Sequence, residues 1–474
     1  MNRREMIRLL ALSGISKMLP GNMLQANYAS SLSASLLGKD FVWGVATAAY
    51  QIEGAHNMDG KGPSIWDTFS AKKKNIKDGS NGNIACDFYH RYSSDLQIVK
   101  ELGFDVFRFS LSWPRLFPQG NTTPNLAGFD FYQRVIDHCL SLGLSPWITL
   151  YHWDLPQTLE DKGGWTNRDI VNYFSDYTAA CCRAFGNKVK NWIILNEPMG
   201  FTSLGYMTGY HAPGRRGLSH FLPAVHHACL CQSEGGRIVK ELVPGANAGT
   251  TFSCAPVEPK KEKPIHQEAA KRIDVLLNRL FVEPLFGMGY PWKDLPFLKK
   301  IEKYMKEDDE KKMVFNFDFI GIQNYFRVIG RYSLYPPLIW ANEVKAEKRD
   351  VPLTAMKWEI HPEGLYKILK KMSAYPIKNF YITENGAAFN DIVENGRVHD
   401  GLRIAYFKDY IAQMLRAKEE GIPVKGYLAW TLMDNFEWAE GFSARFGIVY
   451  NDFSTQERII KDSGLWFKEF LHNK

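Results

Sequence analysis

The chain has 474 residues, of which 45% are hydrophobic and 23% are charged, and its net charge is +7 at pH 7. This composition is ordinary for a soluble globular protein, and the length suits either several average domains or one α/β barrel with long loops. Because the net charge is modest and no stripe of Lys and Arg interleaves with aromatic residues, we do not expect nucleic acid as a partner.

The first 38 residues differ in character from the rest of the chain. Arg3 and Arg4 precede a short apolar stretch, a pattern that resembles a degenerate twin-arginine export signal. Lys17 and Pro20 interrupt the apolar part, so the segment predicts no transmembrane helix and no stable membrane insertion. We therefore expect a leader over residues 1–38 and a periplasmic or secreted protein, with a cytoplasmic protein as the alternative.

From Phe41 onward, apolar runs alternate with amphipathic helical patterns, and no long Pro/Ser-rich linker separates them. The apolar runs that predict buried strands are 41–50, 104–109, 146–151, 192–195, 248–253, 317–322, 380–383 and 426–431. The clearest helical patterns are 132–140, 170–185, 365–372 and 406–417. Eight alternating units predict a single domain over residues 39–474, an α/β fold of the (β/α)8 TIM-barrel type, with a doubly wound open sheet as the alternative.

Several segments are too long to be simple connections between these elements. They are 53–87, 155–168, 200–219 and 327–358. Because the first three directly follow predicted strands, we expect long loops over the C-terminal face of the barrel that shape a pocket there.

The cysteines and paired histidines predict no metal site. The seven cysteines show neither a C-x-x-C pair nor zinc spacing with histidine, so we expect free, partly buried thiols. The adjacent His226 and His227 cannot easily face one metal ion from a helix, and we interpret them as structural.

Polar and aromatic residues follow or end most of the predicted strands. The candidates are Gln51, Arg108, His152, Asn196, Glu197, Tyr325, Glu384, Trp430, Glu437 and Trp438. Residues of these types are individually more often core polar groups or caps, so the inference depends on their equivalent positions. If the barrel forms, these positions converge on one mouth.

Glu197 and Glu384 end the fourth and seventh runs, on opposite sides of an eight-stranded barrel. Two opposed carboxyls are the groups that glycoside hydrolysis requires, one as general acid and the other as nucleophile or base. A cation such as Arg108 near Glu384 would hold it anionic while Glu197 keeps its proton. This chemistry needs neither a metal nor an organic cofactor. Sequence spacing alone does not decide between retention and inversion.

From Phe41 to its C-terminus, the chain resembles glycoside hydrolase family 1, the β-glucosidase family. The matching segments are 41–54, 107–115, 151–156, 196–198, 383–386 and 430–450. The resemblance implies a retaining mechanism in which Glu384 is the nucleophile and forms a glycosyl-enzyme, while Glu197 is the acid and then the base.

The resemblance also implies supporting roles around these two carboxyls. Arg108 and Tyr325 match partners of the nucleophile, and Asn196 matches the residue that binds the sugar 2-hydroxyl. The residues that match the family's other sugar contacts are Gln51, His152, Trp430, Glu437 and Trp438.

Two positions refine this expectation. Gln323 stands where the family commonly has Asn, so the role of Tyr325 depends on an ungapped alignment. Relatives that act on 6-phosphosugars replace the carboxylate at Glu437, and an anion there would repel a phosphate. We therefore expect the substrate to be a β-glucoside or short β-linked oligosaccharide with an unphosphorylated terminal glucose, and galactose or fucose as tolerated substitutes.

Three other functions are compatible with the barrel. The first is a catalytically silent sugar-binding protein, which would need to have lost Glu197 or Glu384, and both are present. The second is a 6-phospho-β-glycosidase, which conflicts with Glu437. The third is a metal-dependent hydrolase, for which the chain lacks a His-x-His after the first predicted strand.

Overall fold

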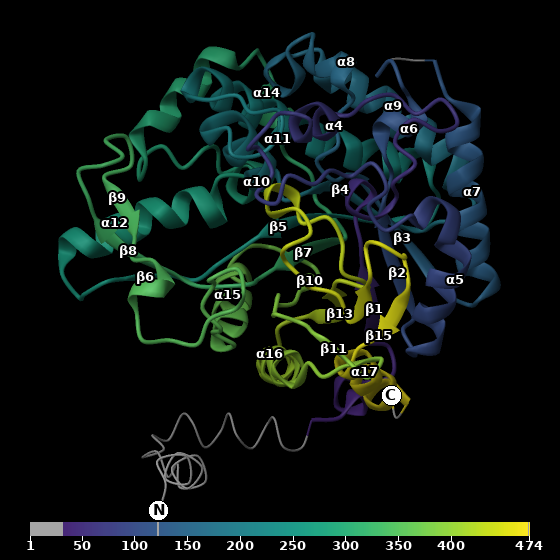
Figure 1. Cartoon of the computed structure of the whole chain (residues 1–474). Helices are drawn as coiled ribbons and strands as arrows, with labels where there is room; N and C mark the ends of the chain where they lie inside the picture. The colour runs from purple at the N-terminus through teal and green to yellow at the C-terminus, as the bar shows by residue number, and fades with distance from the viewer. Residues whose placement is uncertain (1–31, 121–122, 473) are drawn as a thin grey trace, which may run out of the picture.

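The computed structural model describes residues 32–120, 123–472 and 474 (Figure 1). Most of the predicted leader, including Arg3 and Arg4, lies outside these ranges, so the export signal stays a prediction. The described part begins just before a short 3-10 helix, η1 (Ala34–Leu37), whose residues Ala34 and Leu37 are buried against the core.

Eight parallel strands close into a barrel at the centre of the molecule (Figure 1). They are β1 (Val42–Ala46), β2 (Val106–Ser110), β3 (Ser145–Tyr151), β4 (Asn191–Asn196), β5 (Asn247–Ser253), β7 (Phe319–Gln323), β10 (Phe380–Asn385) and β13 (Val424–Trp430). Neighbours pair in chain order, and β13 pairs with β1 to complete the closure. Each strand overlaps one predicted run. The predicted barrel is confirmed, and the open-sheet alternative is wrong.

The first strand is shorter than its apolar run predicts. It ends at Ala46, and the helical turn α3 (Ala49–Ile52) follows. Thr47 Oγ1 donates to Arg108 O at 3.1 Å, and Ala49 N donates to Ser110 Oγ at 2.7 Å. These bonds to β2 end the strand and place Gln51, which is buried, at the carboxyl end of the barrel.

Helices surround the barrel, with α5 and α7 on one side of it and α12 on the other (Figure 1). The longer helices are α5 (Phe88–Glu101), α7 (Leu126–Ser141), α9 (Ile170–Phe185), α11 (Leu218–Leu242), α12 (Pro264–Asp274), α15 (Glu363–Met372), α16 (Gly401–Glu419) and α17 (Asp462–His472). The four predicted patterns are confirmed as α7, α9, α15 and α16. In α15 the buried positions Leu365, Ile368, Leu369 and Met372 recur at helical spacing, which explains why this stretch is a helix packed on the barrel.

The long segments that follow the barrel strands carry short elements of their own. These are α4 (Ile65–Ser70), α6 (Trp113–Leu116), α8 (Gln157–Glu160), η2 (Gly164–Thr166), α10 (Pro198–Thr202) and the π-helical turn η3 (Ser203–Thr208). Further short helices are the π-helical turn η4 (Val275–Arg279), α13 (Val282–Leu285), η5 (Pro296–Tyr304), α14 (Asp309–Lys312), η6 (Ala346–Lys348) and η7 (Trp438–Glu440).

Three small sheets lie outside the barrel. Segment 327–358 contains β8 (Val328–Tyr332) and β9 (Ala341–Glu343), which join β6 (Val257–Pro259) in a three-stranded sheet. This sheet lies beside α12, away from the barrel axis (Figure 1). The two-stranded sheets consist of β11 (Val393–Glu394) with β12 (Arg397–Val398), and β14 (Val449–Asn451) with β15 (Arg458–Ile460).

The cysteines and the two histidines belong to the packed interior. All seven cysteines are free and buried. His226 Nε2 lies 2.9 Å from Asp309 Oδ2, and His227 Nδ1 lies 2.8 Å from Trp165 O, so both rings contribute to packing contacts. Within the described residues, no cluster of His, Cys, Asp and Glu has a metal-binding arrangement, and no helix is long and apolar enough to cross a membrane.

Candidate active site

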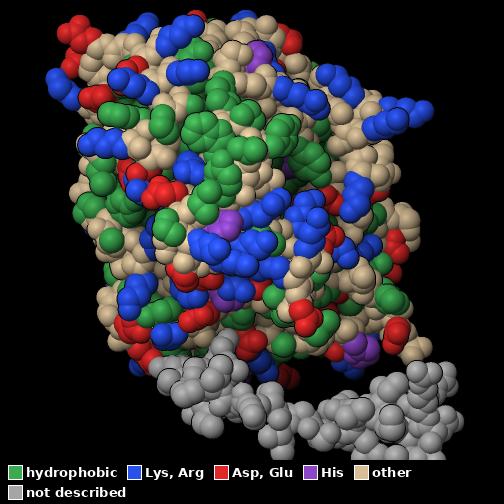
Figure 2. All heavy atoms as spheres, turned by 90° about the vertical axis from the view of Figure 1, so that its left-hand side faces the viewer, with side chains coloured by type: hydrophobic (Ala, Val, Ile, Leu, Met, Phe, Trp, Pro, Cys, Tyr) green, Lys and Arg blue, Asp and Glu red, His purple; other side chains and the backbone are tan. Residues whose placement is uncertain are grey.

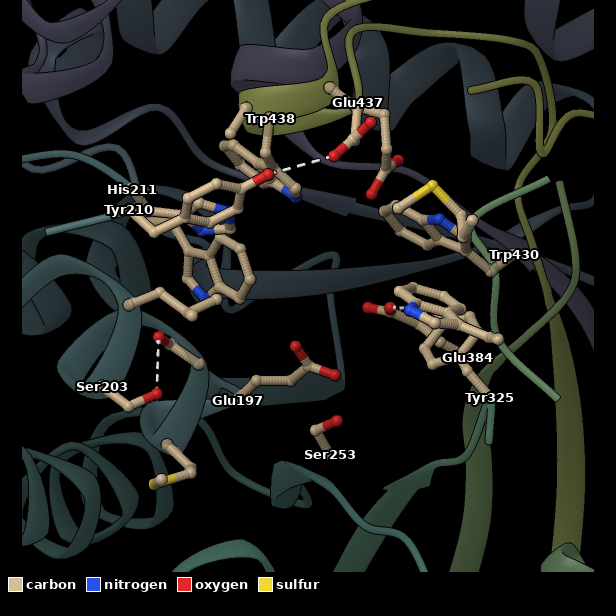
Figure 3. Close-up of a pocket in the computed structure, with 18 of the residues that line it drawn as sticks. Glu197, Ser203, Tyr210, His211, Ser253, Tyr325, Glu384, Trp430, Glu437 and Trp438 are labelled. Carbon is tan, nitrogen blue, oxygen red and sulfur yellow. Dashed lines mark hydrogen bonds between the residues drawn. The ribbon is translucent and has the colours of Figure 1, made fainter. Parts of the chain in front are cut away.

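A cavity of about 450 Å³ opens at the carboxyl ends of the barrel strands (Figure 3). Seven of the ten candidate residues line it: His152, Glu197, Tyr325, Glu384, Trp430, Glu437 and Trp438. The other three, Gln51, Arg108 and Asn196, are buried, and each hydrogen-bonds to a residue of the lining. The structure therefore brings the whole candidate set together.

Glu197 and Glu384 both line the cavity, and their carboxyl groups point toward one another across it (Figure 3). Glu197 directly follows β4, and Glu384 lies near the end of β10. Their positions agree with the prediction that strands four and seven of the barrel present two opposed carboxyls.

A sharp backbone turn directs Glu197 into the cavity. Its backbone is left-handed, with φ 44° and ψ 66°, and Pro198 immediately begins α10. Trp153 and Trp438, which also line the cavity, have φ values of 79° and 48°. A non-glycine residue in this region costs about 1–3 kcal/mol, and such residues concentrate at functional sites. The left-handed backbone thus lowers local stability but places these side chains at the cavity.

The carboxylate of Glu384 has a hydrogen-bond partner on each oxygen. Arg108 Nη1 donates to Oε1 at 2.7 Å, and the hydroxyl of Tyr325 donates to Oε2 at 2.7 Å. Arg108 is itself fixed, because it also donates to Thr383 O and to Thr149 Oγ1 at 2.9 and 3.0 Å. Two charge-assisted bonds from rigid donors hold the carboxylate in one orientation.

The two carboxyls differ in their tendency to hold a proton. Burial and the negative charge of Glu384 raise the pKa of Glu197 well above its ordinary value, and a hydrogen bond from Ser253 opposes this only in part. Burial also raises the pKa of Glu384, but the charge of Arg108 and the bond from Tyr325 lower it. The proton that the pair shares is therefore favoured on Glu197, and Glu384 is favoured as the anion.

The side-chain amide of Asn196 is locked by its neighbours. Its Oδ1 accepts from Arg108 Nη2 at 2.5 Å, Thr251 Oγ1 at 3.1 Å and Gln323 Nε2 at 2.8 Å. Its Nδ2 lies 2.9 Å from His152 Nε2, so the amide donates and the imidazole accepts. Gln323, whose role the sequence left open, is thus a support for Asn196.

This contact also assigns the proton of His152. Burial and the nearby Arg108 lower the pKa of His152 well below its ordinary value, so the ring is neutral. Because Nε2 is the acceptor, the network assigns the hydrogen to Nδ1, which is buried and has no partner. His152 therefore presents a free donor at the cavity.

Gln51 and Glu437 form a second polar cluster. Gln51 Nε2 lies 3.1 Å from Asn435 Oδ1, 3.0 Å from Phe436 O and 3.2 Å from Glu437 Oε2. Its Oε1 is buried without a partner. A buried polar atom without a partner is costly, so Gln51 Oε1 is an unused acceptor beside Glu437.

The expectation that Glu437 is an anion needs correction. Burial and the charge of Glu384 raise the pKa of Glu437 to about 8, so the carboxyl is mostly protonated in the free site at neutral pH. It can donate as well as accept a hydrogen bond. Repulsion by Glu437 is therefore not the main barrier to a phosphorylated sugar. In the described residues, the cavity lining contains four glutamates and neither Lys nor Arg, so a phosphate would find no counter-charge.

Aromatic rings enclose the polar groups. Trp430 and Trp438 stack with His152 at ring-centroid distances of 5.9 and 5.7 Å. Trp153 lies 4.7 Å from Trp438, and its Nε1 donates to Asn196 O at 3.0 Å. The peptide bond between Trp430 and Thr431 is cis. The flat faces of these tryptophan rings suit the apolar face of a sugar ring.

Sequence reasoning missed the apolar part of the lining. It consists of Met199, Leu204, Leu277, Phe326, Met356, Trp358 and Phe446. Of these residues, only Leu204 lies in a segment, 200–219, whose length and position after a predicted strand signalled a pocket. His211 was also missed, and burial lowers its pKa to about 3, so it lines the cavity as a neutral ring.

Comparison with known proteins agrees with this geometry. The family model for glycosyl hydrolase family 1 matches residues 33–474. "Beta-glucosidase A" of Thermotoga maritima is 44% identical over 91% of this chain and 97% of that protein. "Beta-glucosidase A" of Acetivibrio thermocellus is 45% identical over 92% of this chain and 98% of that protein.

Solved structures agree as well. The family 1 β-glucosidase from Thermotoga maritima matches with a TM-score of 0.88 and 44% identity, covering 92% of this chain and 97% of that chain. A structure of the Thermotoga maritima β-glucosidase in complex with deoxynojirimycin matches with the same TM-score and identity, and covers 92% and 98%. The chain therefore belongs to glycosyl hydrolase family 1, a family of retaining enzymes.

Proposed function

We propose that the protein is a retaining β-glucosidase that removes terminal nonreducing β-D-glucosyl residues from β-glucosides and short β-linked oligosaccharides in carbohydrate catabolism. Galactosyl and fucosyl residues are tolerated alternatives. The observation that carries the proposal is the opposition of Glu197 and Glu384, with both oxygens of Glu384 held by Arg108 and Tyr325. The relatives named β-glucosidase support it.

In the first step, Glu384 attacks the anomeric carbon while Glu197 gives its proton to the glycosidic oxygen. The bond between the anomeric carbon and that oxygen breaks, and the aglycone leaves as a neutral alcohol. A covalent ester joins the sugar to Glu384. The ester removes the negative charge of Glu384, which raises the pKa of Glu197. The pKa of Glu197 therefore falls, and Glu197 stays ionised as the carboxylate that the next step needs.

In the second step, Glu197 takes a proton from a water molecule, and the oxygen of that water attacks the anomeric carbon. The ester bond to Glu384 breaks, and the carboxylate returns to its bonds with Arg108 and Tyr325. Two displacements at one carbon restore the original configuration, so the product is β-glucose. Glu197 ends the cycle protonated, as it began.

The polar groups of the cavity suit the hydroxyls of the bound sugar. Asn196 is positioned for the 2-hydroxyl, where a contact that strengthens at the transition state accelerates the reaction. The unpartnered Nδ1 of His152 and Oε1 of Gln51 offer one donor and one acceptor, and Glu437 offers both. Trp438 completes this wall, and Trp430 serves as the platform under the ring.

An unphosphorylated sugar fits this site better than a 6-phosphosugar. The cavity lining in the described residues has no cation, and Arg108 is committed to Glu384 and Asn196. A dianionic phosphate would therefore lose its hydration without gaining a counter-charge.

The cavity favours apolar leaving groups. Its apolar lining, which includes Phe326, Met356 and Trp358, offers a surface that an aryl or alkyl aglycone would bury. A second glucose would leave several hydroxyls facing these side chains. We therefore propose a higher kcat/KM for aryl and alkyl glucosides than for cellobiose.

Export by the twin-arginine route is also a proposal. It rests on the Arg3-Arg4 pattern in the sequence. The free, buried cysteines are compatible with a protein that folds before it crosses the membrane. Cell fractionation of the full chain beside an Arg3→Lys/Arg4→Lys variant tests it. Export that is unchanged in the variant would contradict the route.

A kinetic panel tests the proposed activity. We expect nitrophenol release from nitrophenyl β-glucoside, slower release from the β-galactoside and β-fucoside, and a strong preference for cellobiose over its 6-phosphorylated form. Sugar affinity without turnover would instead indicate a binding protein. A preference for the phosphorylated disaccharide would indicate a 6-phospho-β-glycosidase.

A further inference from the structure

The hairpin formed by β8 and β9 exposes an unusual number of apolar side chains at its tip, residues 333–340. Leu334 and Tyr335 are 74% and 76% exposed, and Trp340 and Leu338 are 54% and 40% exposed. Scattered apolar residues are normal on a surface, but a contiguous group of large ones marks an interaction site.

Hydrogen bonds to its backbone carbonyl groups hold the tip in place. Ser333 Oγ donates to Tyr335 O at 2.6 Å, and Trp340 N donates to Pro336 O at 3.0 Å. From α12, Arg272 donates to Ile339 O and Trp340 O at 2.6 and 3.0 Å. Because the backbone groups find partners within the protein, the apolar side chains are presented outward from a supported loop.

A basic groove lies at the base of the same hairpin, with a volume of about 800 Å³. The cationic residues that line it are Lys260, Arg327, Arg331, Lys345, Lys348 and Arg349. Among the described residues of its lining, Glu343 is the single carboxyl. Figure 2 shows this face of the molecule, where Lys and Arg side chains form a continuous area next to a group of hydrophobic side chains.

Most of these cations are not neutralised within the protein. Arg327 and Arg349 both pair with Glu359, at 2.8 and 2.6 Å. The other four, Lys260, Arg331, Lys345 and Lys348, form no ion pair with any residue that the structure describes. Two exposed carboxyls of the same segment, Glu347 and Asp350, do not line the groove. The groove therefore carries a net positive charge that an external anion would neutralise.

We propose that the apolar tip and the basic groove together dock the protein on an anionic lipid bilayer. Tyr and Trp side chains favour the boundary between headgroups and acyl chains, and Lys and Arg at the same depth meet lipid phosphates. An acidic polysaccharide would use the cations and the aromatic faces, but it offers nothing to Leu334 and Leu338. The combination thus favours lipid.

The docking surface is separate from the catalytic machinery and does not depend on the proposed reaction. None of its cations and none of its four exposed apolar residues lines the catalytic cavity. The hairpin is nevertheless bounded in the chain by Phe326 and Met356, which do line it. Because the docking residues themselves do not line the catalytic cavity, binding at this surface is expected to leave hydrolysis of a water-soluble glucoside unchanged.

Co-sedimentation of the full chain with vesicles tests the proposal. We expect binding to vesicles that contain equal amounts of phosphatidylcholine and phosphatidylglycerol, weaker binding as salt is raised, and little binding to phosphatidylcholine alone. Reversal of two charges, Lys345→Glu with Lys348→Glu, should lower the partition coefficient at least about 25-fold, since each lysine near such a surface contributes about fivefold.

Two further variants separate the parts of the surface. Tyr335→Ser with Trp340→Ser should abolish the binding that persists at high salt. The matched control is Lys100→Glu with Arg134→Glu, which reverses two exposed charges on α5 and α7 at the opposite side of the barrel and should bind as the wild type does. Unchanged hydrolysis of nitrophenyl β-glucoside shows that each variant is folded.

Three results would overturn the proposal. The first is the absence of binding to anionic vesicles at low salt. The second is equal loss in the control and in the groove variant, which would show a non-specific charge effect. The third is a Tyr335/Trp340 variant that binds vesicles as strongly as the wild type does, together with a wild type that is retained on an acidic polysaccharide such as polygalacturonate. That result would assign the face to a polysaccharide.

Discussion

Arg108 of β2 and Glu384 of β10 form a buried ion pair across the barrel mouth, with 2.7 Å between Nη1 and Oε1. The pair places a fixed positive charge beside the carboxylate that we propose as the nucleophile. Such a charge stabilises the anion before the attack and again when the ester breaks. Arg108 and Tyr325 together orient the carboxylate, because each donates to one of its two oxygens.

Replacing Arg108 by Met should lower kcat/KM for nitrophenyl β-glucoside roughly a hundredfold to a thousandfold, as removal of one pre-organised donor does in other enzymes. The pKa of Glu384 should rise, because the cation that lowers it is gone. Since Glu384 must be ionised to attack, the acid limb of the pH profile should move to higher pH. Arg115→Met is the matched control, because Arg115 is equally buried but pairs with Glu53. Its acid limb should not move, whereas an equal shift in both variants would contradict the assignment.

Glu197→Gln should affect substrates according to their leaving groups. A dinitrophenyl glucoside needs little acid assistance, so its first step should be nearly unchanged, whereas an alkyl glucoside should lose on the order of a hundredfold to ten-thousandfold. In the wild type, activity should fall as the pH rises through the raised pKa of Glu197. The variant should lack this basic limb. Pre-steady-state release of the aglycone measures both effects, and equal losses on good and poor leaving groups would count against the role.

Gln323→Ala should weaken catalysis through Asn196. Loss of the 2.8 Å bond frees the amide that we propose binds the sugar 2-hydroxyl, so kcat/KM for a β-glucoside should fall about tenfold. A 2-deoxyglucoside, which lacks that hydroxyl, should be affected much less. Thr251→Val removes another donor to the same oxygen and should give the same pattern. A loss that is equal on both substrates would indicate a general structural role instead.

Glu437→Gln should change how stability depends on pH. The folded protein keeps the proton of Glu437 up to about pH 8, whereas the unfolded chain ionises near 4.5. The free energy of unfolding therefore falls as the pH rises through this window, by at most about 1.4 kcal/mol per pH unit from this group. The variant lacks this dependence, so its Tm should exceed that of the wild type at pH 8 and match it more closely at pH 5. Parallel Tm curves for the two proteins would refute the raised pKa.

The barrel and the two opposed carboxyls could be predicted from the sequence because their signals are local. Strands such as β4 are short apolar runs, and Glu197 and Glu384 stand at their ends. The apolar runs, the helical spacing of the residues between them and the rule that strand ends meet at one face of a barrel were sufficient.

The finer contacts depend on folding and carry no local signal. Gln323 and Asn196 are 127 residues apart in the chain, and only barrel closure brings them within 2.8 Å. The protonation of Glu437 follows from burial beside Glu384, which the residue type does not reveal. Likewise, Leu277 and Trp358 reach the cavity from separate loops with no common pattern.

The central claim is that Glu384 becomes covalently attached to the sugar. The most direct measurement is peptide mapping by mass spectrometry after reaction with a dinitrophenyl 2-deoxy-2-fluoro-β-glucoside. The fluorine slows both steps, and the good leaving group keeps the first step faster, so the intermediate accumulates. We expect one fluoroglucosyl group per chain, on the peptide that contains Glu384. A label on any other residue, or release of α-glucose from an ordinary β-glucoside with no label, would contradict the account.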